Sequence, residues 1–122
     1  MNDYRKYFKD CRIPSDIVKC KNDWYCLIIP MVYRDGDYVE IFVRRIEDGT
    51  FQLSDDGDLF GTHSVFGDKD KMITKMLNSG NLSYKNGELT STATEENLAQ
   101  RVISMASSMI ATDYLSHMNL GR

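Results

Sequence analysis

The pattern of apolar and polar residues predicts β-strands over residues 24–54, either as a continuous apolar run or as an alternation with a period of two. An apolar run from Trp24 to Val32 has the composition of a buried strand. The next run, Tyr38 to Ile46, places Val39, Ile41 and Val43 on one face, and its other face is mixed in polarity and predicted to be half covered. Phe51 and Leu53 continue a third strand. Asp-Gly turns separate the runs, and such turns favour hairpins. We therefore expect a three-stranded antiparallel meander over residues 24–54.

After Gly57 the apolar residues recur at helical spacing. This change predicts helices within residues 56–79, of which the clearer covers 68–79. The pair Asn86-Gly87 predicts a short hairpin over 82–91. Thr92 followed by Glu95 matches the capping box that begins many helices, so a long C-terminal helix is expected over 95–117.

The N-terminal residues complete this prediction. Apolar residues at helical spacing indicate a helical segment at 1–14, ended by Pro14, with a turn at Ser15 and Asp16. The chain of 122 residues fits one domain. We expect a single α+β domain, residues 1–122, in which the meander and the short hairpin pack against two or three helices, including the long C-terminal one.

Composition narrows the cellular context. No apolar run is long enough to span a membrane, and the N-terminus lacks the apolar core of a signal peptide. The three cysteines form no C-x-x-C pair, so reduced thiols are expected. These features predict a cytoplasmic protein, in the host cytoplasm if the gene belongs to a phage.

Negative charge is concentrated in one segment. Residues 46–70 contain Lys69 as their only base and seven acidic residues. Such a segment repels nucleic acid and favours a partner protein with a basic surface. The residues predicted to form this partner-binding surface are Glu47, Asp48, Asp55, Asp56 and Asp58.

The run FQLSDDGDLF, residues 51–60, lies within this segment and has two other interpretations. In the first, Ser54 or Asp55 caps the following helix at a strand-to-helix corner. In the second, Glu40 joins Asp55, Asp56 and Asp58 in a metal-dependent hydrolase site, with Lys69 or Lys71 nearby. The spacing does not fit a calcium-binding EF-hand loop, because no glutamate stands at its twelfth position.

Motifs for other chemistry are missing from the sequence. There is no G-x-S-x-G elbow and no phosphate-binding glycine loop. We therefore expect no catalytic residue, no metal and no cofactor, and a protein that is not an enzyme. A nucleic-acid-associated accessory role is the alternative, and it would use Arg5, Lys6, Lys9, Arg44 and Arg45.

The order of features resembles a family of small bacterial and phage proteins known as domain of unknown function 1828. The similar parts are LIIPMV, DGDYVEIFV, FQLSDDGDLF and the NGEL hairpin, followed by a long helix. The resemblance implies an α+β domain of phage or mobile-element origin and brings no known catalytic residues. It favours a stoichiometric binding protein, such as an inhibitor of a host or defence protein of the anti-CRISPR kind.

Overall fold

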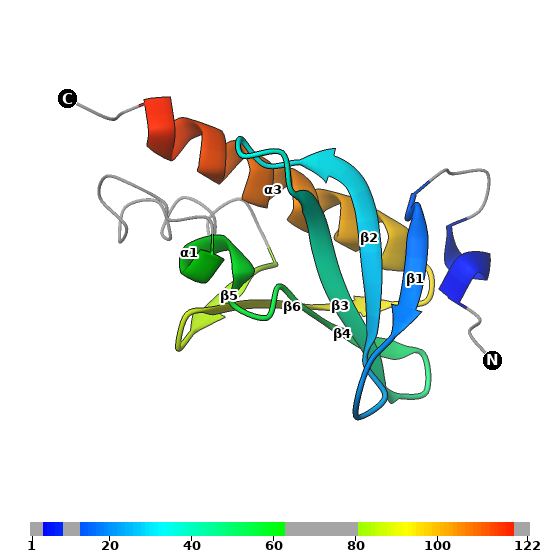
Figure 1. The fold of residues 1–122 in the computed structure, drawn as a ribbon. Coiled ribbons are helices and arrows are strands. Elements are labelled where there is room, and N and C mark those ends of the chain that lie inside the picture. Colours follow the sequence, from blue (N-terminus) through cyan, green and yellow to red (C-terminus); the bar gives the residue numbers. More distant parts are fainter. Residues whose placement is uncertain (1–3, 9–12, 63–80, 119–122) are drawn as a thin grey trace.

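The computed structural model of the chain describes residues 4–8, 13–62 and 81–118. Its fold is α+β, with one six-stranded antiparallel sheet in the order β1-β2-β3-β4-β6-β5 (Figure 1). The strands are β1 (Asp16–Lys19), β2 (Tyr25–Val32), β3 (Tyr38–Glu47), β4 (Thr50–Ser54), β5 (Ser83–Lys85) and β6 (Glu88–Thr94). The helices are the 3₁₀ turn η1 (Tyr4–Tyr7), α1 (Asp58–Thr62) and α3 (Leu98–Met118).

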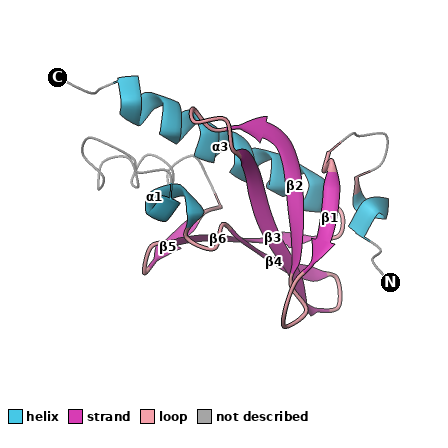
Figure 2. Cartoon of the chain, in the orientation of Figure 1, coloured by secondary structure: helices cyan, strands magenta, loops and turns pink. Residues whose placement is uncertain are grey.

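The two faces of the sheet have different surroundings. On the inner face, Val39, Ile41 and Val43 of β3 are fully buried. Helix α3 covers this face and contacts β2, β3 and β6, and Figure 2 shows it running behind the sheet. Side chains alternate along a strand, so Tyr38, Phe42 and the other intervening residues of β3 lie on the opposite, outer face.

The core lies between the inner face and the helices. Leu98, Val102, Met105 and Met109 recur at helical spacing along α3 and are buried, which explains how this helix packs on the sheet. Tyr4 of η1 packs against Phe51, with ring centroids 5.8 Å apart. Helix α3 is also attached by polar contacts, which include a hydrogen bond of 2.7 Å from the Arg34 amide to the buried Asp113 carboxylate.

The structure confirms the α+β class and extends the sheet beyond the prediction. The expected meander corresponds to β2, β3 and β4. The sequence predicts a turn at Asp16, but residues 16–19 form strand β1, because Asp16 to Lys19 pair with Ile28 to Tyr25. The expected separate hairpin is part of the same sheet, because β6 pairs with β4 along five residues.

The predicted capping box at Thr92 is wrong. Strand β6 continues through Thr94, whose partner is Thr50, and this pairing keeps residues 92–94 extended. The Oδ1 of Asn97 accepts a hydrogen bond of 2.7 Å from the Thr94 amide, and α3 begins at the next residue, Leu98. The helix predicted over residues 68–79 lies outside the described residues. Neither α1 nor α3, the α-helices of the described ranges, is long and apolar enough to cross a membrane.

Candidate functional site

Asp55 joins the corner between β4 and α1 to the neighbouring strand β6. Its side chain is 0% exposed. Its Oδ1 accepts hydrogen bonds from the amides of Gly57 (2.8 Å) and Leu89 (2.9 Å), and its Oδ2 accepts one from the amide of Leu59 (3.1 Å). Asp55 therefore caps the start of α1 and fixes it to the sheet, as the structural interpretation of this run predicts, and its carboxylate is not exposed to a partner.

Burial governs the acidity of this carboxyl group. Removal from water raises the pKa of Asp55 above its ordinary value of 3.8, although the three backbone amides act in the opposite direction. The corner also needs special backbone geometry, since Asp56 and Gly57 have φ angles of 53° and 76°. Aspartate and glycine tolerate this left-handed region better than most residues.

The other predicted site residues do not form one surface. Glu47 and Asp48 are exposed at the turn between β3 and β4, whereas Asp56 is exposed and Asp58 half-buried at the far end of β4. Strand β4 alone separates the two groups by about 13 Å, which exceeds the Debye length of about 8 Å at physiological ionic strength. The acidic segment of the sequence is thus divided into two sites in the fold.

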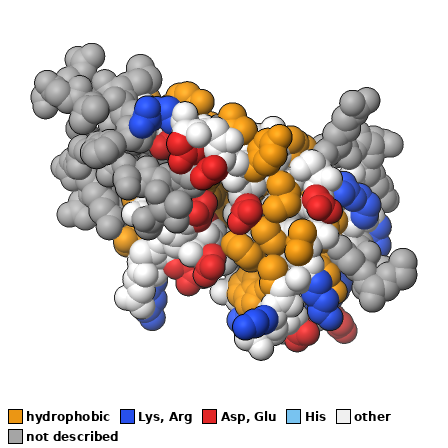
Figure 3. All heavy atoms as spheres, in the orientation of Figure 1, with side chains coloured by type: hydrophobic (Ala, Val, Ile, Leu, Met, Phe, Trp, Pro, Cys, Tyr) orange, Lys and Arg blue, Asp and Glu red, His pale blue; other side chains and the backbone are white. Residues whose placement is uncertain are grey.

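The outer face of the sheet carries an apolar patch. Six large hydrophobic side chains are exposed among the described residues, and four of them lie on this face: Val18, Val32, Tyr38 and Ile46. The half-buried Trp24, Ile28 and Phe42 extend the patch between them. Figure 3 shows hydrophobic side chains gathered over the sheet, with acidic side chains beside them. We call this set of seven residues the outer-face patch.

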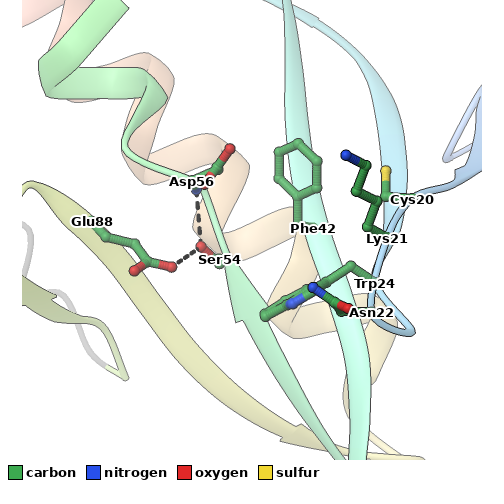
Figure 4. A pocket seen from close by; sticks show the side chains of 8 residues that line it. All are labelled: Cys20, Lys21, Asn22, Trp24, Phe42, Ser54, Asp56 and Glu88. Carbon is green, nitrogen blue, oxygen red and sulfur yellow. Dashed lines mark hydrogen bonds between the residues drawn. The ribbon is translucent and has the colours of Figure 1, made fainter.

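A cavity of about 390 Å³ opens into the patch. The turn between β1 and β2 contributes Cys20, Lys21, Asn22 and Trp24, and Phe42 comes from β3. Ser54 and Asp56 come from the end of β4 and the corner after it, and Glu88 from the start of β6. Figure 4 shows the two carboxylates on one side of Phe42 and Lys21 on the other. The cavity therefore has an acidic wall, an aromatic centre and one basic group on its opposite rim.

Ser54 organises the acidic wall. Its hydroxyl donates a hydrogen bond to Glu88 Oε2 and accepts one of 2.9 Å from the Asp56 amide. Within the described ranges, no further hydrogen bond or ion pair reaches the second oxygen of Glu88 or the carboxylate of Asp56. The wall thus presents oxygen acceptors that a bound cation or N–H donor could use.

The aromatic centre is fixed from one side. The guanidinium of Arg44 lies 4.7 Å from the ring centroid of Trp24 and donates two hydrogen bonds to Gln52 Oε1, at 3.1 and 2.9 Å. Arg44 does not line the cavity, whereas Trp24 does. The indole is therefore held in place and keeps part of its surface available to a ligand.

Cys26 lies beneath this region and is buried. Desolvation, aided by the negative charge of Glu40, raises the pKa of its thiol from 9.0 to about 12. A thiol of this kind stays protonated at neutral pH and is a poor nucleophile. Cys26 on β2 is paired with the half-buried Phe42 on β3, and this position indicates that its side chain has a packing role.

The residues of the two alternative functions are also separated. Within residues 4–8, 13–62 and 81–118, no three His, Cys, Asp or Glu side chains are grouped so as to hold a metal ion. Lys69 and Lys71 of the hydrolase hypothesis, and Lys9 of the nucleic-acid hypothesis, lie outside the described residues. Arg44 and Arg45 point to opposite faces, and Arg45 lies on the Phe51 ring at 4.7 Å and donates to the Tyr7 hydroxyl.

The sequence predicts a mixed second face for β3 but neither a binding patch nor a cavity on it. Their signal was present in β3, where Tyr38, Phe42 and Ile46 alternate with the buried valines and isoleucine. On this face they are interspersed with Glu40 and Arg44, and large apolar side chains on the solvent side of an antiparallel strand indicate a contact surface. The acidic wall had no comparable signal, because Asp56 and Glu88 are 32 residues apart in the sequence.

The fold class and this site define a small α+β domain with a partly apolar sheet face that the described residues leave exposed. The model of the family described as domain of unknown function DUF1828 matches residues 29–112, which is more than half of the chain. The chain therefore belongs to this family. No curated protein and no solved structure matches it. Phe42, Ser54, Asp56 and Glu88 fall inside the matched range, whereas the β1–β2 side of the cavity precedes it.

Proposed function

We propose that this protein is a non-enzymatic binding module that docks a partner protein on the outer face of its sheet. The observation that carries the proposal is the clustering of Val18, Val32, Tyr38 and Ile46 on one face. Isolated exposed hydrophobic residues are common, but a contiguous patch edged by polar groups is typical of a protein interface. Tyrosine and tryptophan, both present here, are also enriched at interface hot spots.

The charges around the patch favour a basic partner. Glu40 is exposed on the outer face, and Asp56 and Glu88 line its cavity. Carboxylates at the rim of an apolar surface accelerate association with positively charged partners and exclude acidic ones. We therefore propose Glu40, Asp56 and Glu88 as the acidic groups that face the partner. Asp55 is buried, and Glu47 and Asp48 lie at the other end of β4, so these three residues are not part of the proposed surface.

The finer form of the proposal is stoichiometric inhibition of a host or defence protein. It is supported by the resemblance to small phage proteins and by a sequence that contains no nucleophile elbow or phosphate loop. Inhibition by docking requires no catalytic group, only an interface of adequate area, on the order of 800 Å² per partner.

Site-specific photo-cross-linking in bacterial cells tests the proposal. A benzophenone amino acid is placed at Tyr38 on the patch or, as a matched control, at Tyr114, an exposed tyrosine of α3. We expect one protein to be captured from Tyr38 and not from Tyr114, and expect a folded Val18→Asp variant to abolish the capture. Equal capture from both positions, or none from Tyr38, would refute the use of this face.

A further inference from the structure

We propose that the cavity beside Phe42 receives an arginine side chain of the partner protein. The inference rests on the proposed function and names the chemistry at its centre. Four described segments build the cavity: the β1–β2 turn, β3, the β4–α1 corner and the start of β6. Its volume of about 390 Å³ lies within the range of pockets that enclose small ligands. It therefore accommodates one long side chain together with its immediate surroundings.

The acidic wall matches the donors of a guanidinium group. Glu88 is held by Ser54, and the same serine hydroxyl fixes the backbone of Asp56, so the two carboxylates are attached to one hydrogen-bonded unit. A guanidinium offers five N–H donors in a planar fork and forms strong hydrogen bonds with carboxylates. The acceptor oxygens of Asp56 and Glu88 that no described group uses give this fork its partners.

The aromatic centre favours a planar cation. Trp24 and Phe42 both line the cavity, and aromatic faces attract cations, with tryptophan the strongest. The protein itself shows this contact on the same indole, where the Arg44 guanidinium lies 4.7 Å from the ring centroid. Arginine stacks on such rings and is less strongly hydrated than lysine, so the site should select arginine over lysine.

Lys21 lies on the opposite rim and is the one cation among the cavity's lining residues. Figure 4 shows its side chain on the side of Phe42 away from Glu88. Its charge opposes the entry of a second cation. The partner's arginine must therefore displace the Lys21 ammonium toward water, where a long flexible side chain is readily accommodated. Lys21 consequently lowers the affinity of the site without taking part in recognition.

The test uses small probes of defined chemistry on the full chain. N-acetyl-arginine methylamide, its lysine analogue and its neutral citrulline analogue are titrated against ¹⁵N-labelled protein. The signal is the indole N–H of Trp24, the single tryptophan of the chain, which gives one resolved reporter inside the cavity. We expect a saturable shift with the arginine probe. Binding should be weaker by about fivefold or more for the citrulline probe, because its ureido group is neutral and has fewer N–H donors for the carboxylates.

Matched variants test whether the carboxylates of Asp56 and Glu88 bind the arginine probe. Asp56→Asn with Glu88→Gln should weaken the arginine probe by about fivefold or more while keeping the shape of both side chains. Glu47→Gln with Asp48→Asn changes the net charge equally at the far end of β4 and should leave binding unchanged. Lys21→Met should strengthen binding by about two- to fourfold, because it removes a partly screened repulsion.

Three results would overturn the inference: no saturable shift with the arginine probe, equal binding of arginine and citrulline probes, or unchanged binding in the Asp56→Asn, Glu88→Gln variant. If the arginine probe fails while Tyr38 still cross-links a protein, the cavity inference is wrong and the docking function stands. If the probe binds but no protein cross-links at Tyr38, the claim that the arginine belongs to a partner protein is wrong. The ligand of the cavity is then a free guanidinium compound.

Discussion

Replacing Asp55 with alanine should destabilise the fold substantially. The carboxylate accepts three backbone hydrogen bonds, and the amides of Leu59 and Leu89 are in buried surroundings, so water cannot replace it there. Each buried donor left without an acceptor costs about 1–3 kcal/mol. Two such donors give about 2–6 kcal/mol, and relief of the desolvated charge offsets part of this cost. We expect a loss of about 2–4 kcal/mol out of the 5–15 kcal/mol typical of a domain.

Urea unfolding, followed by circular dichroism and by the fluorescence of Trp24, measures this loss. The midpoint should fall in Asp55→Ala with an unchanged slope, because the surface exposed on unfolding is the same. Asp55→Asn keeps one acceptor oxygen and should lose about half as much. Asp56→Asn is the neighbouring control, since its exposed side chain should change stability by less than about 0.5 kcal/mol. An Asp55→Ala protein within about 0.5 kcal/mol of wild type would refute this account of the corner.

Three further predictions follow from the same contacts. Because burial raises the folded-state pKa of Asp55 above 3.8, its contribution to stability is complete below that pH and is lost as the pH rises through the folded-state value. The stability advantage of wild type over Asp55→Asn should thus be larger at pH 4 than at pH 7, and the reverse order would contradict the raised pKa. Peptide-resolved alkylation at pH 8 should label Cys20 well before Cys26, whose pKa is raised to about 12; equal rates would contradict its burial. Asp113→Ala should lower the free energy of unfolding by about 1–3 kcal/mol through loss of its bond to the Arg34 amide, and no change in a denaturation curve would contradict this.

Local patterns in the sequence were sufficient for most of the elements. The apolar run of β2 and the alternation in β3 reflect burial against α3, and the Asn86-Gly87 turn predicts the β5–β6 hairpin directly. The partner of β6 could not be obtained in this way, because its pairing with β4 joins residues about 40 positions apart in the chain. This pairing also extends β6 through Thr94, although the capping-box pattern at Thr92 predicts the start of a helix there. Hydrogen bonds between β4 and β6 therefore set the end of β6 and the start of α3, and the local pattern predicted both wrongly.

The acidic residues show why charge in a sequence segment does not define a surface. Asp55 and Asp56 are adjacent, yet one is buried under three amides and the other is exposed. Asp56 instead shares a cavity with Glu88, which the hairpin brings to the end of β4. Only the strand order places these two carboxylates beside Phe42. The candidate site is thus a product of sheet topology, whereas Phe42 belongs to the mixed face of β3 that the sequence predicts.

The most direct measurement of the central claim is the affinity of the protein for the partner captured at Tyr38. Isothermal titration should compare wild type with Tyr38→Asp on the patch and Tyr114→Asp on α3, which alter equally conspicuous exposed tyrosines. If the outer face is the docking surface, Tyr38→Asp weakens binding by about 30-fold or more, the scale of an interface hot spot, and Tyr114→Asp leaves it unchanged. Unchanged affinity in a folded Tyr38→Asp variant, or an equal loss in both, would contradict the claim.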